Sequence, residues 1–268
     1  MIENVKPASI YSRHLCHCLT FRYKRVHISR PEEMTPKPTS SHAKYCFPSP
    51  HHPSKMSTNT NTDIFTIHAV PGTDIWRKPP TTNIYNAPTA APRTTRSRGP
   101  LSSFLSARAS FSFPWRERYD QAGILLAFRP RSSSFPSETK EEIPQKWIKT
   151  GIEFYQSAPQ FSTVATDNWA DWSVTPLTSP TDWTTILVEK SGDKHGKSLW
   201  VYRVVLDEKT GEEKERIALR EICWVYGLDG EAWDLEVVAM AARPEKNAEG
   251  GEELVVKVRG WEVKWEEE

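Results

Sequence analysis

One short segment, residues 147–155, carries side chains whose types and spacing could perform chemistry. Polar or aromatic positions alternate there with apolar ones, which is typical of a β-strand whose successive side chains point to opposite faces of a sheet. The even positions hold Ile148, Thr150, Ile152 and Phe154, and the odd positions hold Trp147, Lys149, Gly151, Glu153 and Tyr155. We therefore expect the even positions to face a core and the odd positions to form a second, more polar surface.

That second surface has the composition of a site for a sugar-like ligand, which needs flat apolar stacking and a few fixed hydrogen bonds. Trp169, Asp171 and Trp172 follow on an expected loop that could border the same face. An alternative is that Lys149 and Glu153 form an ion pair while the aromatic residues fill the face beneath a loop. The predicted ligand-binding residues are Trp147, Lys149, Glu153, Tyr155, Trp169, Asp171 and Trp172.

The acidic residues do not form a pattern typical of catalysis. A glycoside hydrolase needs two carboxylates on either side of the bond that it cleaves. Glu153 has no second acid two residues away, and in residues 229–236 only Asp234 and Glu236 fit a strand. Asp167 and Asp171 could approach Glu153 only through the fold. We predict no catalytic residue and keep glycan hydrolysis as the alternative function.

Metal and cofactor motifs are missing as well. His14, Cys16, His17 and Cys18 are close in the chain, but no second ligand pair lies at the distance that a zinc site requires. The chain has no phosphate-binding loop and no nucleophile motif of the Gly-x-Ser-x-Gly type. Cys223, in an expected strand, is predicted to be a buried structural thiol. The sequence thus predicts neither a metal nor a cofactor.

Composition narrows the classes of partner. The chain has 268 residues, 37% of them hydrophobic, and a net charge of +1. This content suffices for a sizeable core, and the small net charge argues against a nucleic-acid partner. No apolar run approaches the roughly 18 residues of a membrane-spanning helix. We therefore expect neither nucleic-acid nor membrane binding.

Short strands separated by turns must position the candidate residues. In the last expected strand the apolar positions change parity at Gly260, which predicts a β-bulge. About ten strands without alternating helices indicate one sandwich of two sheets. The strands expected most clearly cover residues 104–113, 122–128, 147–155, 183–189, 199–206, 217–226, 235–242 and 254–265.

Residues 1–55 have a different composition from the rest of the chain. They contain no Gly, no Trp and six of the eight His, and prolines break any helix after residue 30. We predict a disordered, basic, Pro/His-rich extension without the apolar core of a secretory signal. A translation start at Met56 and a weak mitochondrial targeting segment are the alternatives. The expected location is cytoplasmic, with the mitochondrion as the alternative.

Four motifs in order carry a resemblance to a known family: residues 119–123, 147–154, 171–173 and 220–224. Residues 63–268 resemble the regulation-of-enolase family of concanavalin-A-like lectin/glucanase sandwiches. The resemblance implies a jelly roll, an intracellular location and a glycolytic enzyme as a protein partner. The chain departs from the family pattern in a longer loop at residues 129–143 and in residues 232–243, where a glycine is expected.

The sequence thus predicts an all-β, concanavalin-A-like jelly-roll sandwich of two antiparallel sheets, with a disordered N-terminal extension. The expected domains are residues 1–55 and residues 63–268. The predicted function is non-catalytic binding of a carbohydrate, a sugar phosphate or a protein partner on the concave face. A glycan-active hydrolase is the alternative, and a flat apolar patch without a cleft would instead indicate a pure protein-interaction module.

Overall fold

The computed structural model describes residues 64–131, 143–178, 181–207, 209–246 and 251–267. All of them belong to one compact unit, residues 58–268. The predicted extension at residues 1–55, with its four closely spaced His and Cys residues, lies outside the described residues, as do residues 132–142 of the predicted long loop. No helix in the described part of the chain is long and apolar enough to cross a membrane.

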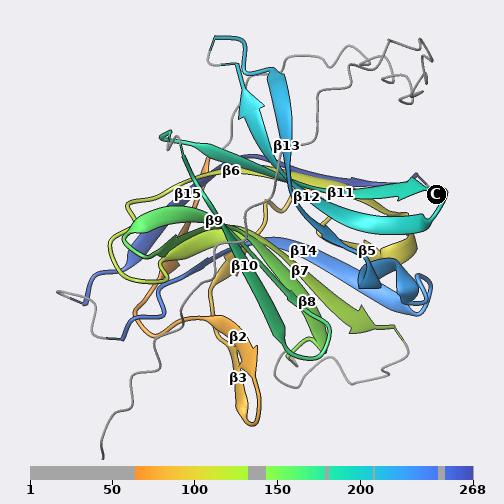
Figure 1. Cartoon of the computed structure of the whole chain (residues 1–268), viewed down its shortest axis with the longest axis horizontal. Coiled ribbons are helices and arrows are strands. Elements are labelled where there is room, and N and C mark those ends of the chain that lie inside the picture. Colours follow the sequence, from red (N-terminus) through yellow and green to blue (C-terminus); the bar gives the residue numbers. More distant parts are fainter. Residues whose placement is uncertain (1–63, 132–142, 179–180, 208, 247–250, 268) are drawn as a thin grey trace, which may run out of the picture. The chain divides into compact units, whose positions relative to one another are not determined.

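Two sheets packed face to face make up the fold (Figure 1). All strand pairs in both sheets are antiparallel. The six-stranded sheet has the order β1 (Phe65–Ala69), β15 (Leu254–Trp265), β6 (Phe104–Ser112), β11 (Thr184–Asp193), β12 (Gly196–Leu206), β13 (Glu213–Ile222). The seven-stranded sheet has the order β10 (Ala170–Pro176), β9 (Ala158–Thr166), β8 (Lys146–Tyr155), β7 (Gln121–Pro130), β14 (Trp233–Ala242), β4 (Thr89–Ala90), and β5 (Arg98–Pro100) also pairs with β14. This arrangement confirms the predicted antiparallel sandwich.

The main core lies between the two sheets and contains Ile148 and Ile152 of the even positions of β8, as their alternation predicts. Its largest fully buried side chains include Phe104 and Phe111 from the six-stranded sheet and Phe128 from the seven-stranded sheet. Strands β7 and β9 are buried on both faces. Because both of their faces are covered, a second layer must pack on the outer side of the seven-stranded sheet.

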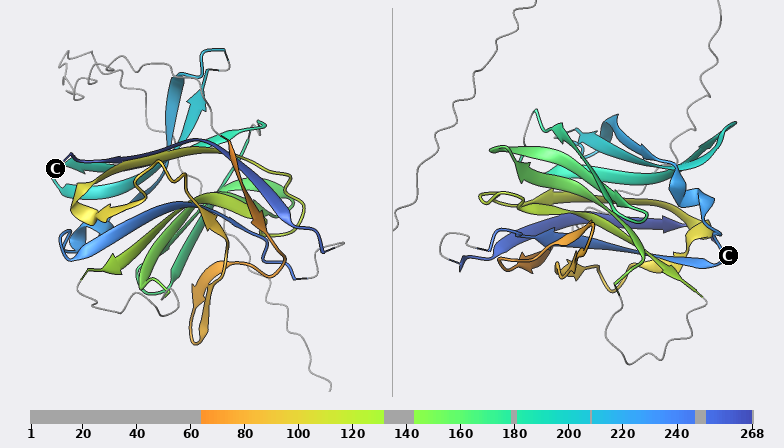
Figure 2. Two further views of the ribbon diagram at one scale, coloured as in Figure 1. Left: turned by 180° about the vertical axis from the view of Figure 1, so that it is seen from behind. Right: turned by 60° about the horizontal axis from the view of Figure 1, so that its bottom comes forward.

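That second layer is a small hairpin formed by β2 (Ile75–Lys78) and β3 (Thr82–Tyr85). It projects on the side of the seven-stranded sheet, as Figure 2 shows from behind. Ile75 packs there with Leu125, Trp147, Val164 and Met240 in a second apolar cluster. The odd face of β8 is therefore partly covered by a segment that lies about 75 residues earlier in the chain.

Two predictions on local structure have different outcomes. The bulge at Gly260 is confirmed, because this residue has a φ of 59° and the pairing register with β6 shifts between Arg259 and Glu262. The predicted strand over residues 217–226 is too long. β13 ends at Ile222, and a 3₁₀ turn, η2 (Trp224–Gly227), follows. Cys223 lies at this transition and is exposed, so the prediction of a buried thiol is wrong.

Candidate functional site

The candidate site lies on the outer face of β8 and its neighbours β7 and β9. Gly151 pairs with Gly123 of β7 on one side and with Ser162 of β9 on the other. A Cβ on Gly151 would lie 2.0 Å from the carbonyl oxygen of Ala122 and 2.5 Å from the Cα of Gly123. Only glycine fits this contact, because the two backbones approach so closely. The sheet beneath the site is therefore fixed by a glycine pair.

A small recess opens over this glycine pair. Its volume is about 10 Å³, which is enough for at most one water molecule. The residues around it come from four neighbouring strands and include both polar and apolar side chains. They include Gln121 from β7, Lys149 from β8, Ser162 from β9 and Met240 from β14.

Lys149 is buried in this face and has fixed partners. Its Nζ donates to the Oε1 of Gln121 at 2.8 Å and to the Oδ1 of Asp74 at 3.1 Å. The Oδ1 of Asp74 also accepts from the backbone N–H of Ile75 at 2.7 Å. The ammonium lies 5.9 Å from the ring centre of Trp76. These contacts compensate the burial of the Lys149 charge and tie the β2–β3 hairpin to the sheet.

Glu153 is the second buried charged residue of the face, with 5% of its surface exposed. Its Oε2 accepts from the hydroxyl of Ser162 at 2.5 Å and from the indole N–H of Trp172 at 3.1 Å. Burial raises the pKa of Glu153 above its ordinary value, and the nearby charge of Lys149 opposes this effect. In the described part of the chain, no hydrogen bond reaches Oε1. This oxygen is thus an acceptor without a protein partner.

Four partly exposed aromatic side chains, Trp76, Tyr119, Tyr155 and Trp172, adjoin these two residues, and we call them the aromatic rim. Trp172 contacts Tyr155 edge to face at 4.9 Å and Trp76 at 6.4 Å between ring centres. Tyr119 stacks on Tyr155 at 5.6 Å, and the guanidinium of Arg118 covers its ring at 4.9 Å. The rim presents apolar ring surface beside a hydrogen-bonding carboxylate.

The backbone at Tyr119 holds this part of the rim in an unusual conformation. Tyr119 has a φ of 69°, which costs energy for a residue other than glycine. The next residue, Asp120, is fully buried and accepts from both Nε and Nη2 of Arg243 at 2.8 Å. Its Oδ2 also accepts the backbone N–H groups of Arg116 and Glu117 at 3.0 Å. This buried ion pair fixes the loop from which Tyr119 projects.

Comparison with known proteins identifies the family. A family described as "Protein of unknown function (DUF1349)" matches residues 51–264. An uncharacterised protein of Emericella nidulans is 38% identical over 192 residues, which are 72% of this chain and 82% of that protein. This chain belongs to the DUF1349 family.

A solved structure shares the fold of this DUF1349 protein. A functionally unknown protein from Saccharomyces cerevisiae is 18% identical, covers 76% of this chain and 89% of its own, and has a TM-score of 0.50. A glycoside hydrolase family protein from Mycobacterium thermorestibile is 11% identical, covers 73% of this chain and 75% of its own, and has a TM-score of 0.37. At 18% identity, the likeness to the Saccharomyces cerevisiae protein concerns the fold alone.

The structure of this DUF1349 protein brings four of the seven predicted residues together: Lys149, Glu153, Tyr155 and Trp172. Trp147 shares their sheet face but is fully buried under the β2–β3 hairpin, where it packs as part of the second apolar cluster. Lys149 pairs with Asp74, and not with Glu153 as the alternative proposed. The alternative also expected aromatic side chains to fill this face beneath another segment, and Trp147 does so beneath the β2–β3 hairpin.

The remaining two predicted residues, Trp169 and Asp171, lie outside this group. Asp171 and Trp172 are on strand β10 and not on a loop. Alternation along β10 directs Asp171 to the opposite face, where its carboxylate forms an ion pair with Arg220 of β13, with 2.5 Å between Oδ2 and Nη2. Arg220 also donates to the hydroxyl of Ser173 at 2.8 Å. Trp169 lies in the turn before β10 and is 42% exposed.

Five further residues belong to the site and were not predicted: Asp74, Trp76, Tyr119, Gln121 and Ser162. Tyr119 and Gln121 are part of the first family motif, residues 119–123, which was the one available signal for them. Ser162 of β9 pairs with Gly151 of the neighbouring strand β8, so its place in the site follows only from the pairing register of these two strands. Among the described residues, no group of three or more His, Cys, Asp or Glu is arranged to hold a metal ion.

Proposed function

We propose that this DUF1349 protein is a non-catalytic binding protein that takes a carbohydrate-like ligand at the aromatic rim. The observation that carries the proposal is the carboxylate of Glu153, which is buried and held by Ser162 and Trp172, and of which one oxygen has no partner among the described residues. A sugar hydroxyl would donate to that oxygen while an apolar sugar face stacks on the rim.

The charges of the site favour a neutral sugar over a sugar phosphate. Asp74 and Glu153 are both acidic. The buried cation near them is Lys149, which donates to Asp74 and whose charge acts on Glu153. This ammonium already donates to Asp74 and Gln121, so two of its three N–H groups are not available to a phosphate. A dianionic group would also be repelled by the two carboxylates. Arg118, at the outer edge of the rim, is the group that could receive a phosphate or an acidic sugar.

Binding is favoured over glycan hydrolysis because, among the residues that the structure describes, no second carboxylate near Glu153 is free of an ion pair. Asp74 lies close enough for its charge to act on Glu153, but its carboxylate forms an ion pair with Lys149, and its Oδ1 also accepts from the backbone of Ile75. A hydrolase needs one acid and one base or nucleophile that are both free to act on the substrate. The other acids considered above form ion pairs: Asp234 with Arg98 and Arg131, Glu236 with Arg129, and Asp167 with Lys146.

The resemblance to the regulation-of-enolase family adds a protein partner to the proposal, namely a glycolytic enzyme, and the cytoplasm as the compartment. Titration of the full chain with purified glycolytic enzymes, followed by light scattering, tests this part. Formation of a complex supports it, and no complex with any of them refutes it.

A thermal-unfolding screen of the full chain against neutral sugars and sugar phosphates tests the ligand. Saturation at 100 times Kd adds about 2.7 kcal/mol to the free energy of unfolding, which raises Tm by about 5–10 °C for a domain of this size. We expect the shift to vanish in Glu153→Gln and Trp172→Phe and to persist in Trp169→Ala, which removes an exposed indole outside the rim. A shift that persists in both rim variants would contradict the proposal, as would no shift with any sugar.

A further inference from the structure

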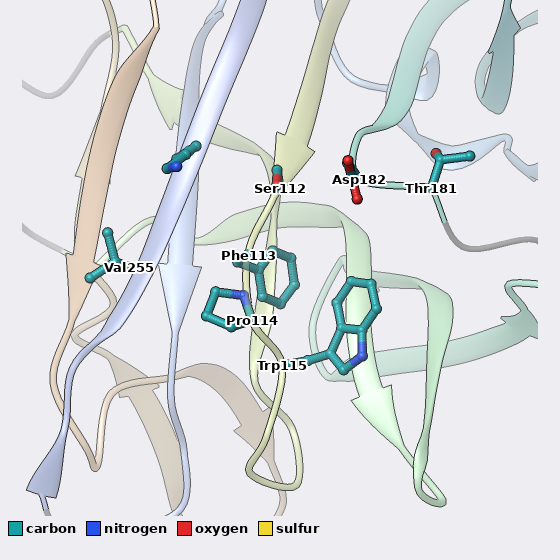
Figure 3. A pocket seen from close by; sticks show the side chains of 8 residues that line it. Ser112, Phe113, Pro114, Trp115, Thr181, Asp182 and Val255 are labelled. Carbon is teal, nitrogen blue, oxygen red and sulfur yellow. The ribbon is translucent and has the colours of Figure 1, made fainter.

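A second concave site lies away from the aromatic rim, at the end of β6. It is a recess of about 430 Å³ between the segment after β6, the strand β15 and the segment before β11 (Figure 3). This volume falls within the range of about 300–1,000 Å³ that small-molecule sites occupy. The lining residues are Ser112, Phe113, Pro114, Trp115, Thr181, Asp182, Val255 and Lys257.

One wall of the recess is an aromatic surface. Phe113 is almost fully buried, and Trp115 is half-buried and meets it edge to face, with 5.5 Å and 89° between the rings. The segment behind Trp115 is anchored, because Asp120 accepts the backbone N–H groups of Arg116 and Glu117. The indole is thus held in place before any ligand arrives, which lowers the entropic cost of binding.

The other side of the recess is polar, and its charged groups are unpaired. Figure 3 shows Ser112, Asp182 and Thr181 on one side of the rings of Phe113 and Trp115. Within the described ranges, neither the Asp182 carboxylate nor the Lys257 ammonium forms an ion pair or a side-chain hydrogen bond, and both residues are exposed. The Asp182 carboxylate, the Lys257 ammonium and the Ser112 hydroxyl therefore remain available to a ligand, whereas the Thr181 hydroxyl donates to the carbonyl of Trp183.

These groups together select a chemical class. A purely apolar ligand would cover Asp182 and Lys257 without giving them partners, which costs free energy. A dianionic ligand would be repelled by Asp182. A neutral sugar satisfies both walls, because its apolar ring face stacks on Trp115 and its hydroxyls donate to Asp182 and accept from Lys257. We infer that this recess binds one or two neutral sugar rings, as a site separate from the aromatic rim.

Isothermal titration of the full chain with neutral disaccharides (maltose, cellobiose and laminaribiose) tests the inference. We expect at least one of them to bind, and Trp115→Ala and Asp182→Asn each to weaken its Kd at least tenfold. Asp182→Asn changes an exposed side chain and keeps its shape, so it remains informative if Trp115→Ala fails to fold. Trp169→Ala, which removes an exposed indole outside both sites, is the matched control and should leave the Kd unchanged.

Three results would overturn the inference. One is no heat of binding for any disaccharide at about 10 mM, ten times a Kd of about 1 mM. Another is binding that neither Trp115→Ala nor Asp182→Asn weakens. The third is binding lost in Trp172→Phe alone, which would place the sugar at the aromatic rim and support the proposed function instead. The failure of one site is therefore distinguishable from the failure of the other.

Discussion

Removing the charge of Asp120 should destabilise this protein more than any single change at its surface. The carboxylate is fully buried and accepts four hydrogen bonds, two from the guanidinium of Arg243 and two from the backbone of Arg116 and Glu117. Hydrogen bonding to Asp120 raises the pKa of Arg243, so the pair stays charged. Asp120→Asn keeps the shape and leaves the buried guanidinium without a counter-charge.

The size of this effect follows from burial. Breaking a buried ion pair by removing one partner costs about 3–5 kcal/mol, a large part of the roughly 5–15 kcal/mol that stabilise a typical protein. Arg116, on the same loop as Asp120, forms an ion pair with Glu252 at a similar distance, 3.0 Å, but both side chains are 66% exposed. Glu252→Gln is therefore the matched control and should cost less than about 1 kcal/mol.

Urea unfolding of the wild type and the two variants measures these differences directly. We add the double variant Asp120→Asn with Arg243→Gln, which removes the unpaired buried charge. It should lose less stability than the sum of the two single variants, because the two side chains act as one unit. A cost below about 1 kcal/mol for Asp120→Asn, or additive costs in the double variant, would refute the structural role assigned to this pair.

Three further predictions concern β8. Gly151→Ala should lower the free energy of unfolding, measured in urea, by about 3 kcal/mol or more, because the new Cβ would lie 2.0 Å from a backbone oxygen. The control Gly227→Ala, with open space around it, should lower it by less than about 1 kcal/mol. Equal losses would contradict the glycine-pair argument. Because folding raises the pKa of Glu153, ionisation of this carboxyl should lower the free energy of unfolding as the pH rises past the ordinary pKa of a glutamate, and Glu153→Gln should remove this loss. Parallel curves of stability against pH for the wild type and the variant would contradict this prediction. Trp147→Ala should cost about 3–5 kcal/mol by thermal or urea unfolding, since the indole is fully buried; an unchanged stability with lost sugar binding would instead make Trp147 a ligand contact.

The sheet face of each β8 residue could be predicted because alternation is a local property of the chain. The same argument correctly predicts the bulge at Gly260, where the apolar positions change parity. What covers the odd face of β8 is not local, because the β2–β3 hairpin reaches it from about 75 residues away. For this reason Trp147 was predicted to be a ligand contact and is a buried packing residue, and Asp74 was not predicted.

Two other errors arise at edges of the fold. Strand β10 is an edge strand with mostly exposed side chains, so it has no apolar alternation to reveal it. Asp171 was therefore assigned to a loop beside the site, whereas it pairs with Arg220 on the opposite sheet. At Cys223, an apolar run continues past the end of β13 because the 3₁₀ turn that follows also packs on the core through Trp224 and Val225. An apolar run alone does not distinguish these two structures.

The measurement that tests the central claim most directly is a sugar titration of the wild type and Glu153→Gln side by side, with stability and binding recorded on the same samples. The account predicts that Glu153→Gln is at least as stable as the wild type at pH 7, since it removes a buried charge, and yet loses the sugar-dependent rise in Tm. A Glu153→Gln variant that still gives the full sugar-dependent rise would contradict the claim that this carboxylate receives the ligand.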